Sequence, residues 1–379
     1  MLALSEDTQM LAESAADVLT GHDYPSVIRA QRPLGPAATG FEAEQWQAAV
    51  ELGWTGIAIP EPLGGLGFPV QGLFGLFESA GRSLAGLPLL TQLVIAPSLL
   101  CSASDNWKPR TEAIDSLVQG TQWFGLALDE GTRHAPALCQ TLATPCGLGW
   151  SLTGHKRYAL DATHAQSLLI TACLADTQEM ALFCIPADTP GVQVDPCALI
   201  DQRSRAHVTL SSVALGPDAL VYRGAEFTVA MDQALLLGRA VVSAELLGIS
   251  QTVFDTTLTY LSQREQFDRK LGSFQALQHR MARLHAEIQL ARAGVLGAFE
   301  ALERGPSVAT SSAVAMAKFK AGEVSDLATN EATQLHGGMG VTDELNIGLF
   351  LKRARVAEAL LGDQTYQLAQ LTSLEGASA

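Results

Sequence analysis

The sequence predicts an α+β fold in which two helical regions flank a small β-domain. Apolar residues recur at the three- and four-residue spacing of helices in residues 1–120 and 223–379, whereas residues 121–222 contain short runs of Val, Ile, Leu and Thr between turn residues. The chain has 379 residues, of which 47% are apolar and 17% charged, so it can bury two or three packed layers. We therefore expect an N-terminal α-helical domain at 1–120, a middle β-domain at 121–222 and a C-terminal four-helix bundle at 223–379.

The composition excludes several classes of protein. A formal net charge of −15 argues against nucleic acid or an anionic membrane surface as a partner. The six cysteines form no C-x-x-C pair, and no histidine has a second ligand at helical spacing, so we expect no metal site and reduced, mostly buried thiols. The N-terminus lacks the pattern of a signal peptide, and no apolar stretch is convincing as a membrane span. We therefore expect a cytoplasmic protein that does not insert into a membrane.

In the N-terminal region, Ser5 is expected to cap a first helix whose apolar positions continue to Leu19. The glycine-rich residues 53–67 hint at a phosphate loop, but no strand–turn–helix pattern surrounds them, so that signal is weak. Further helices are expected at 43–52, 70–84, 89–102 with an interruption at Pro97, and 111–118.

In the middle region, six short runs have the composition and spacing of strands in a small antiparallel sheet. They are residues 123–128, 149–153, 167–174, 180–185, 192–194 and 206–210. Beyond Val221 the helical spacing returns. Long helices are expected at 229–261, 277–302, 308–335 and 346–371.

Two turns between these long helices carry the chemistry. In the first, Arg264 supplies a permanent bidentate donor suited to phosphate, Phe267 offers an aromatic face, and Gln275 can recognise an amide or hydroxyl pattern. The second turn, residues 334–340, is rich in glycine. Together these groups suit a nucleotide cofactor. The alternative is a helical hairpin whose arginine pairs with a surface acid.

Residues 264–275 resemble the R-x-Q-F-G-x-x-(L/I)-x-x-F-Q signature of the acyl-CoA dehydrogenases, and residues 334–340 resemble that family's second flavin-contacting turn. The resemblance covers essentially the whole chain and implies the acyl-CoA dehydrogenase fold, with FAD as the cofactor. Asp268 replaces the usual glycine, which leaves the backbone of one turn residue in question. The cofactor-binding residues that the resemblance implies are Arg264, Gln266, Phe267, Leu271, Gln275, Gln334, Gly337 and Gly338.

In this family a carboxylate, usually of a Glu, removes the α-proton of an acyl-CoA thioester while a hydride leaves the β-carbon for the flavin. The two positions that the motifs imply for this base hold Leu361 and Gly238, which cannot accept a proton. Asp363 and Glu245 are possible substitutes, although each is displaced by several ångströms from the expected place. The alternatives are an ion pair of Glu245 with Arg239 or Arg280, and a capping or turn role for Asp363.

The flavin pocket that the β-domain would provide also departs from the family pattern. Leu160 stands where a Thr or Ser would donate a hydrogen bond to flavin N5, and Asp129 places a carboxylate where a hydroxyl is usual. The segment His134-Ala135-Pro136 replaces a G-S-D motif. In this family each flavin lies between two protomers. The chain therefore retains the half of the flavin site that a protomer donates to its neighbour, the two turns, and has lost much of the half that binds its own flavin, the β-domain pocket.

The resemblance therefore implies a subunit that completes the FAD sites of a homologous catalytic subunit, in an α2β2 heterotetramer. The closest resemblance is to the small subunits of heteromeric acyl-CoA dehydrogenases for pimeloyl-CoA or steroid side-chain CoA esters. It implies an acyl-CoA substrate and an electron-transfer flavoprotein as the acceptor. Two alternatives remain open: a self-sufficient homotetrameric dehydrogenase with an unusual base, and a non-enzymatic scaffold or acyl-CoA-binding protein.

Overall fold

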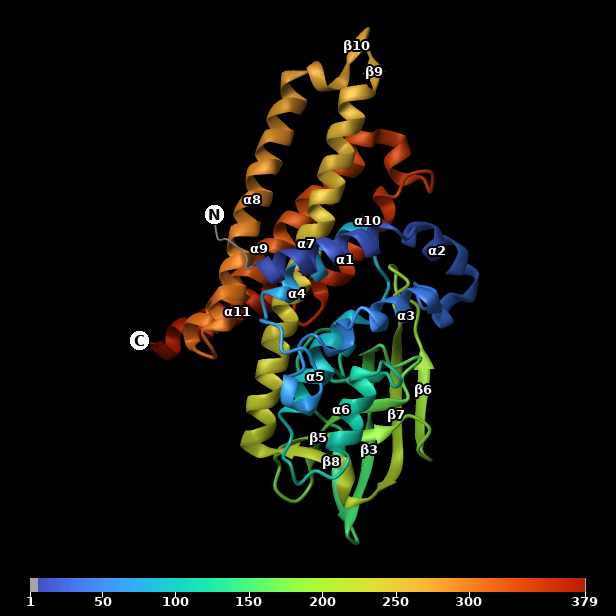
Figure 1. The fold of residues 1–379 in the computed structure, drawn as a ribbon, viewed down its shortest axis with the longest axis vertical. Coiled ribbons are helices and arrows are strands. Elements are labelled where there is room, and N and C mark those ends of the chain that lie inside the picture. The colour runs from blue at the N-terminus through green and yellow to red at the C-terminus, as the bar shows by residue number, and fades with distance from the viewer. Residues whose placement is uncertain (1–5, 379) are drawn as a thin grey trace. The chain divides into compact units, whose positions relative to one another are not determined.

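The computed structural model describes residues 6–378, so the expected cap at Ser5 lies outside the described residues (Figure 1). The chain divides into two compact units. The first consists of residues 1–26, 69–85 and 239–379, and the second of residues 27–68 and 86–238.

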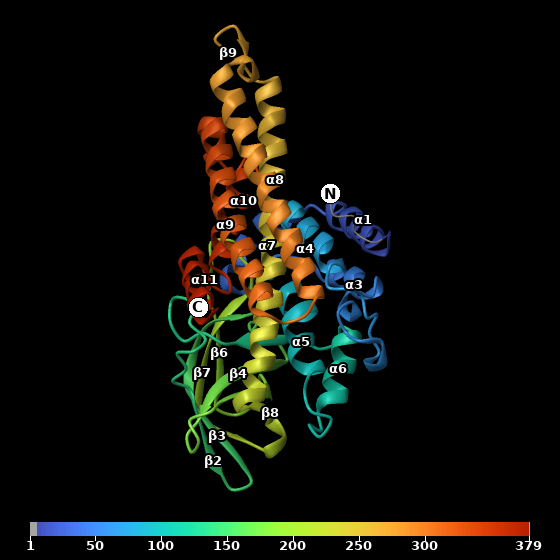
Figure 2. The same ribbon diagram turned by 90° about the vertical axis from the view of Figure 1, so that its left-hand side faces the viewer.

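The second unit contains an eight-stranded sheet in the order β6-β7-β3-β1-β4-β5-β8, with β2 pairing β3 and β4 (Figure 2). The expectation of an antiparallel sheet is wrong in part, because both β1 and β2 pair with β4 in parallel. The sequence also missed the short strands β2 and β8. The strands are β1 (Phe124–Ala127), β2 (Leu142–Cys146), β3 (Gly149–Leu160), β4 (Ser167–Leu174), β5 (Met180–Pro186), β6 (Val192–Pro196), β7 (Arg205–Leu215) and β8 (Leu220–Arg223).

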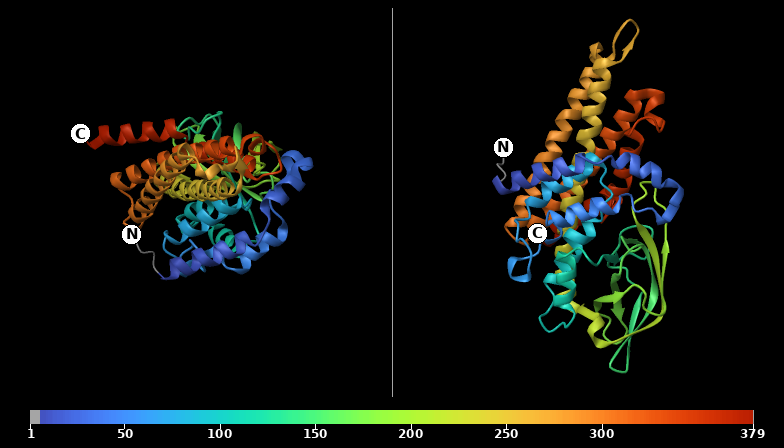
Figure 3. Two further views of the ribbon diagram at one scale, coloured as in Figure 1. Left: turned by 90° about the horizontal axis from the view of Figure 1, so that it is seen from above. Right: turned by 45° about the vertical axis from the view of Figure 1, so that its right-hand side comes forward.

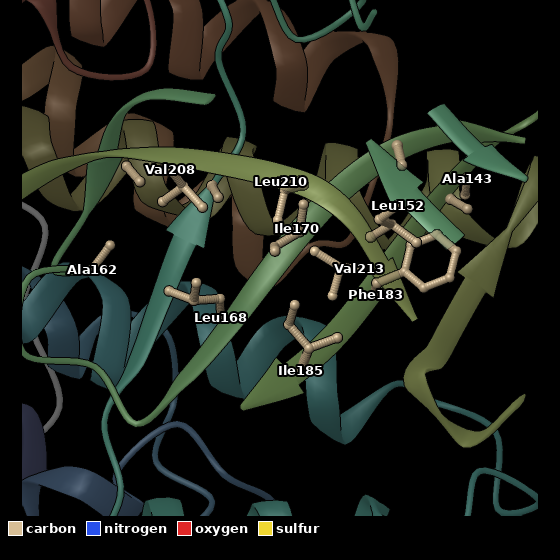
Figure 4. Packing of buried hydrophobic residues seen from close by; sticks show 14 of the residues in the cluster. Ala143, Leu152, Ala162, Leu168, Ile170, Phe183, Ile185, Val208, Leu210 and Val213 are labelled. Carbon is tan, nitrogen blue, oxygen red and sulfur yellow. The ribbon is translucent and has the colours of Figure 1, made fainter. Parts of the chain in front are cut away.

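Small and branched apolar side chains fill the interior of this sheet (Figure 4). Leu168 and Ile170 of β4 contribute to it, together with Phe183 of β5 and Val208 and Leu210 of β7. All five are at most 2% exposed, so each supplies the burial expected of a core residue, about 1.5–3 kcal/mol relative to an exposed position.

Short helices belong to the second unit, and the stretch that precedes one of them is hydrogen-bonded to the sheet. The helices are α2 (Tyr24–Gln31), whose first residues belong to the other unit, α3 (Ala43–Glu51), α5 (Ala96–Cys101) and α6 (Arg110–Val118). A π-helical stretch, Leu90–Ile95, precedes α5. Within that stretch the Gln92 amide donates to the carbonyl of Phe124 at 2.8 Å and accepts from its N–H at 3.1 Å. The Thr91 hydroxyl donates to the carboxylate of Asp161.

The first unit is helical. Its elements are α1 (Glu6–Thr20), α4 (Gly72–Ser83), most of α7 (Gly224–Gln263), α8 (Gln275–Glu303), α9 (Val308–His336), α10 (Ile347–Ala359) and α11 (Gln364–Ser378). Helix α9 packs against α8, α10 and α11. Figure 3 shows α7 and α8, yellow and orange, running to the hairpin that joins their ends.

Helix α7 is long and apolar enough to cross a membrane by length and composition, but 83% of its most apolar 18-residue window is buried within the protein. It is therefore a core helix. The six cysteines are free, as expected, but the expectation that most are buried is wrong: Cys146 is exposed and the other five are half-buried.

One expected helix, 346–371, is broken into α10 and α11 at residues 360–363. Leu361 and Gly362 have positive φ values of 56° and 107° at the break. The Lys318 ammonium donates to the carbonyl oxygens of Ala357 at 3.2 Å and Glu358 at 2.6 Å, so it satisfies the C-terminal end of α10. Burial lowers the pKa of Lys318 to about 8, against the opposing effect of the Glu358 carboxylate.

This lysine predicts a pH dependence of stability. Folding lowers its pKa from 10.5 to about 8, so between these values the unfolded chain binds more protons and the contribution of Lys318 to stability rises with pH. The free energy of unfolding of the wild type, relative to Lys318→Met, should therefore increase by about 2 kcal/mol from pH 8 to about pH 10. Urea unfolding followed by circular dichroism measures this difference. Parallel pH profiles for the two proteins would contradict it.

Candidate functional site

The turn between α7 and α8 is a two-stranded hairpin, β9 (Glu265–Gln266) and β10 (Arg269–Lys270). Its two central residues, Phe267 and Asp268, have φ values of 57° and 60°. Two left-handed residues in a two-residue loop match the twist of the flanking strands, and Asp tolerates this conformation better than most residues. Asp268 therefore takes the conformation that the usual glycine would take at this position.

The hairpin presents its side chains to solvent. Phe267 is 82% exposed, and the Arg264 side chain forms no ion pair or hydrogen bond with any side chain that the structure describes, those of residues 8–374. The Arg269 guanidinium lies 3.7 Å from the centre of the Phe274 ring, which meets Phe267 edge-on at 6.3 Å. An exposed arginine that pairs with no described carboxylate suits an external anion better than a structural ion pair.

Backbone hydrogen bonds fix the hairpin to the helices on both sides. The Arg264 N–H donates to the carbonyl of Tyr260 at 2.8 Å, and the Leu271 N–H donates to the carbonyl of Arg264 at 2.9 Å. The side-chain amide of Gln278 donates to the carbonyl of Gly272 at 2.8 Å. Leu271 is half-buried against this framework, whereas Gln266 and Gln275 are exposed.

The second turn, Gly337–Val341, follows the last residue of α9, and Gln334 lies exposed one turn earlier. Gly337 has φ 61° and ψ −138°, a conformation open to glycine alone. A Cβ atom on Gly340 would lie 2.5 Å from the carbonyl oxygen of Thr333, so a side chain cannot fit there. Gly338 differs from both, because nothing lies within 4 Å of its Cβ position and its φ is not positive. The fold itself therefore does not require glycine at 338, and the open space admits close approach of a ligand.

The helix ends that lead into these two turns contact each other. The ring of Tyr260, at the end of α7, stacks on the ring of His336, at the end of α9, with centroids 4.3 Å apart and planes 27° from parallel. His336 is 4% exposed, and its Nδ1 lies 2.8 Å from the carbonyl of Ala332. His336 is thus a packing residue, and no sequence pattern indicated that its partner would be Tyr260. Across the described chain, no group of three or more His, Cys, Asp and Glu side chains could hold a metal ion.

The proposed base positions offer no carboxylate. Leu361 is 5% exposed, and its carbonyl accepts a hydrogen bond from Nε of Arg239 at 2.9 Å. Gly238 lies within α7. Asp363 accepts from the N–H of Tyr366 at 2.8 Å, so it caps α11, as one of the two alternatives predicts.

Glu245 forms the expected buried ion pair, but with Arg353 and not with Arg280, one of the two expected partners. Its two carboxylate oxygens accept from Nε and Nη2 of Arg353 at 2.8 and 2.7 Å, while Arg280 pairs with Glu331 instead. Both Glu245 and Arg353 are 5% exposed. The sequence missed Arg353 because it follows Lys352 in a short basic cluster that is typical of a surface feature.

In the β-domain, the segment that departs from the family pattern supplies the partners of its own Asp129 carboxylate. The Asp129 carboxylate accepts from the N–H of Ala135 at 2.9 Å and lies 2.9 Å from Nδ1 of His134. Leu160 is 8% exposed and pairs with Leu126 across the sheet. Without a hydroxyl at 160, these residues do not fit the hydrogen-bonding edge of an isoalloxazine ring.

A second polar cluster lies behind this segment. Lys156 is fully buried, and its ammonium donates to Glu130 at 2.7 Å and to the Thr171 hydroxyl at 2.9 Å. Burial of Glu130 opposes its charge, but hydrogen bonds from Lys156, Thr141 and the Gln140 N–H outweigh burial and lower the pKa of Glu130 to about 2. This cluster therefore holds the segment in place independently of any ligand.

A cavity of about 620 Å³ lies between α7 and α8 beside the hairpin. Its lining is largely apolar and includes Phe254, Leu258, Leu261, Leu277 and Met281. Polar side chains, among them Lys270, Gln278 and His285, also line it.

Comparisons with known proteins agree with the resemblance. Residues 225–373 match "Acyl-CoA dehydrogenase, C-terminal domain", and residues 5–111 match "Acyl-CoA dehydrogenase, N-terminal domain". The acyl-CoA dehydrogenase IpdE2 of Mycolicibacterium smegmatis is 27% identical over 371 residues, which cover 97% of this chain and 98% of that protein.

Two solved structures share the fold over nearly their whole length. One is a variant of the Tcur3481-Tcur3483 steroid ACAD, with a TM-score of 0.87, 28% identity and coverage of 100% of both chains. The other is the ChsE4-ChsE5 complex from Mycobacterium tuberculosis, with a TM-score of 0.88, 26% identity and coverage of 100% of this chain and 99% of that one. The expected helical, β-sheet and helical arrangement is therefore confirmed as the acyl-CoA dehydrogenase fold.

The glycines of the second turn predict different effects of adding one methyl group. Gly340→Ala should destabilise the chain by about 1–3 kcal/mol, because its Cβ would collide with the Thr333 carbonyl. Gly338→Ala should leave stability unchanged, because its Cβ would meet open space. Thermal unfolding of the isolated chain compares the two variants, and equal losses of stability would contradict this geometry.

Proposed function

Because the chain belongs to the acyl-CoA dehydrogenase family, we propose that it is a subunit that completes the FAD site of a homologous catalytic partner. The observation that carries this proposal is the pair of exposed turns, where the Arg264 side chain pairs with no described side chain and open space surrounds the Cβ position of Gly338. The same chain has Leu361 and Gly238 at the positions expected for the catalytic base. Members of this family bind FAD.

The donated half of the site consists of groups that fit the adenosine and pyrophosphate of FAD. Arg264 supplies a charge-assisted bidentate donor for the pyrophosphate, and Gly337 and Gly338 allow the backbone to approach it. The bound FAD would accept the hydride released from the β-carbon of an acyl-CoA thioester. The residues proposed to contact it are Arg264, Gln266, Phe267, Leu271, Gln275, Gln334, Gly337 and Gly338.

The catalytic base and the isoalloxazine contacts would come from the partner. Glu245 is committed to Arg353, and Asp363 caps α11, which counts against a self-sufficient enzyme that uses either carboxylate. An exposed arginine at the hairpin that pairs with no described acid counts against a scaffold with no cofactor role, because such a scaffold has no use for an anion donor there.

We further propose an α2β2 heterotetramer that acts in the cytoplasm, with a bulky acyl-CoA ester, such as a steroid side-chain ester, as substrate and an electron-transfer flavoprotein as acceptor. The similar Tcur3481-Tcur3483 structure is described as a steroid ACAD, and ChsE4-ChsE5 as a complex of two named proteins. If half of the active sites are lost, the remaining ones have room for a larger acyl group, which supports this choice.

Arg264 provides the direct test. In a complex co-purified with the acyl-CoA dehydrogenase encoded nearest in the genome, Arg264→Ala should weaken FAD binding about tenfold to a hundredfold, because it removes a charge-assisted contact worth about 1.5–3 kcal/mol. Fluorescence titration of the FAD-depleted complex measures the dissociation constant.

Arg304→Ala is the matched control, since Arg304 is also exposed but lies at the other end of α8. It should leave the FAD dissociation constant unchanged. If the two variants bind FAD as tightly as the wild type does, the hairpin does not contact the cofactor and the proposal is wrong.

A further inference from the structure

Tyr260 and His336 lie outside the motif residues that would contact the cofactor, yet each adjoins one of the two turns. Tyr260 lies four residues before Arg264 in the last turn of α7, and His336 immediately precedes Gly337. Their rings are stacked with centroids 4.3 Å apart, and His336 is almost fully buried. A buried ring that stacks at this distance on a neighbouring helix constrains how the two helix ends lie relative to each other.

The backbone of each residue is connected to its own turn. The carbonyl of Tyr260 accepts the hydrogen bond from the Arg264 N–H, and Arg264 in turn accepts from Leu271, so the first turn is anchored on the tyrosine backbone. On the other side, Gly340 packs against Thr333. A Cβ atom added to Gly340 would lie only 3.2 Å from the Cβ of His336. The backbone that carries each ring is therefore part of the framework that holds a turn.

We propose that Tyr260 and His336 are positioning residues that hold the two turns together as one nucleotide-binding half-site. This inference rests on the proposed function, since it concerns the same FAD half-site. Arg264 on one turn and Gly337 and Gly338 on the other can serve one pyrophosphate only if their separation is fixed, because misplacement of a binding group by about 1 Å is enough to lose most of its contribution. The stack supplies this fixed separation without touching the ligand.

The test substitutes each ring in the co-purified heteromeric complex and measures the FAD dissociation constant by fluorescence. Tyr260→Leu and His336→Leu should each weaken FAD binding about two- to tenfold, the effect expected when an aromatic pair is lost. Tyr260→Phe should restore wild-type binding, because a second aromatic ring keeps the stack. If Tyr260→Leu does not fold, His336→Leu provides the same test from the opposite ring.

A second aromatic pair on α7 is the matched control. Phe254 and His285 also contact each other, with centroids 5.5 Å apart, but Phe254 lies ten residues before Arg264 on α7 and His285 ten residues after Gln275 on α8. Phe254→Leu should lower thermal stability to a similar extent and leave the FAD dissociation constant unchanged. If Phe254→Leu weakens FAD binding as much as Tyr260→Leu does, the effect is one of general stability and the inference fails.

A measurement on the isolated chain needs no partner and no flavin. Arg269 and Lys270 of the hairpin are exposed sites for trypsin, so cleavage there reports on how firmly the turn is held. Tyr260→Leu should speed this cleavage under native conditions, and Tyr260→Phe should not.

The outcomes separate this inference from the function on which it rests. If Arg264→Ala weakens FAD binding while both leucine variants bind and digest like the wild type, the half-site is real but the stack does not position it. If Arg264→Ala has no effect either, the proposed function itself is wrong.

Discussion

The buried ion pair between Glu245 and Arg353 is the interaction on which both the fold and its chemistry depend. It joins α7 to α10 through two hydrogen bonds, with each partner 5% exposed. Removing one member would leave an uncompensated buried charge, at a cost of about 3–5 kcal/mol. Both oxygens of the Glu245 carboxylate accept from Arg353, so the helix packing that stabilises the chain counts against Glu245 as a substitute base.

The polar groups of the chain divide into two kinds. In the β-domain, the Asp129 carboxylate contacts His134 and Ala135, and Glu130 accepts from Lys156, so both carboxylates have partners within the chain. On the two turns, Arg264 projects into solvent and Gly338 leaves open space. Polar groups that are paired in the β-domain but exposed to solvent on the two turns are consistent with a subunit that completes a site belonging to another protein.

Much of the fold could be predicted from sequence because helical spacing and strand composition are local signals. The parallel pairing of β1 with β4 could not, because the choice of neighbour for a short strand depends on tertiary packing. The break at Leu361 was hidden by continuing apolar residues, and its cause, the carbonyl contacts of Lys318 and Arg239, comes from distant helices. Likewise, motifs placed Arg264 and Gln334 on two turns, but only the structure joins those turns, through Tyr260 and His336.

The most direct measurement is the FAD content of the co-expressed complex together with its native mass. Absorbance gives flavin per protein, and native mass spectrometry gives the number of each chain. A mixed tetramer that carries two flavins for its four chains is the expected result, since only the partner would provide isoalloxazine pockets. A homotetramer of this chain alone with four flavins would contradict the division of the site between two proteins.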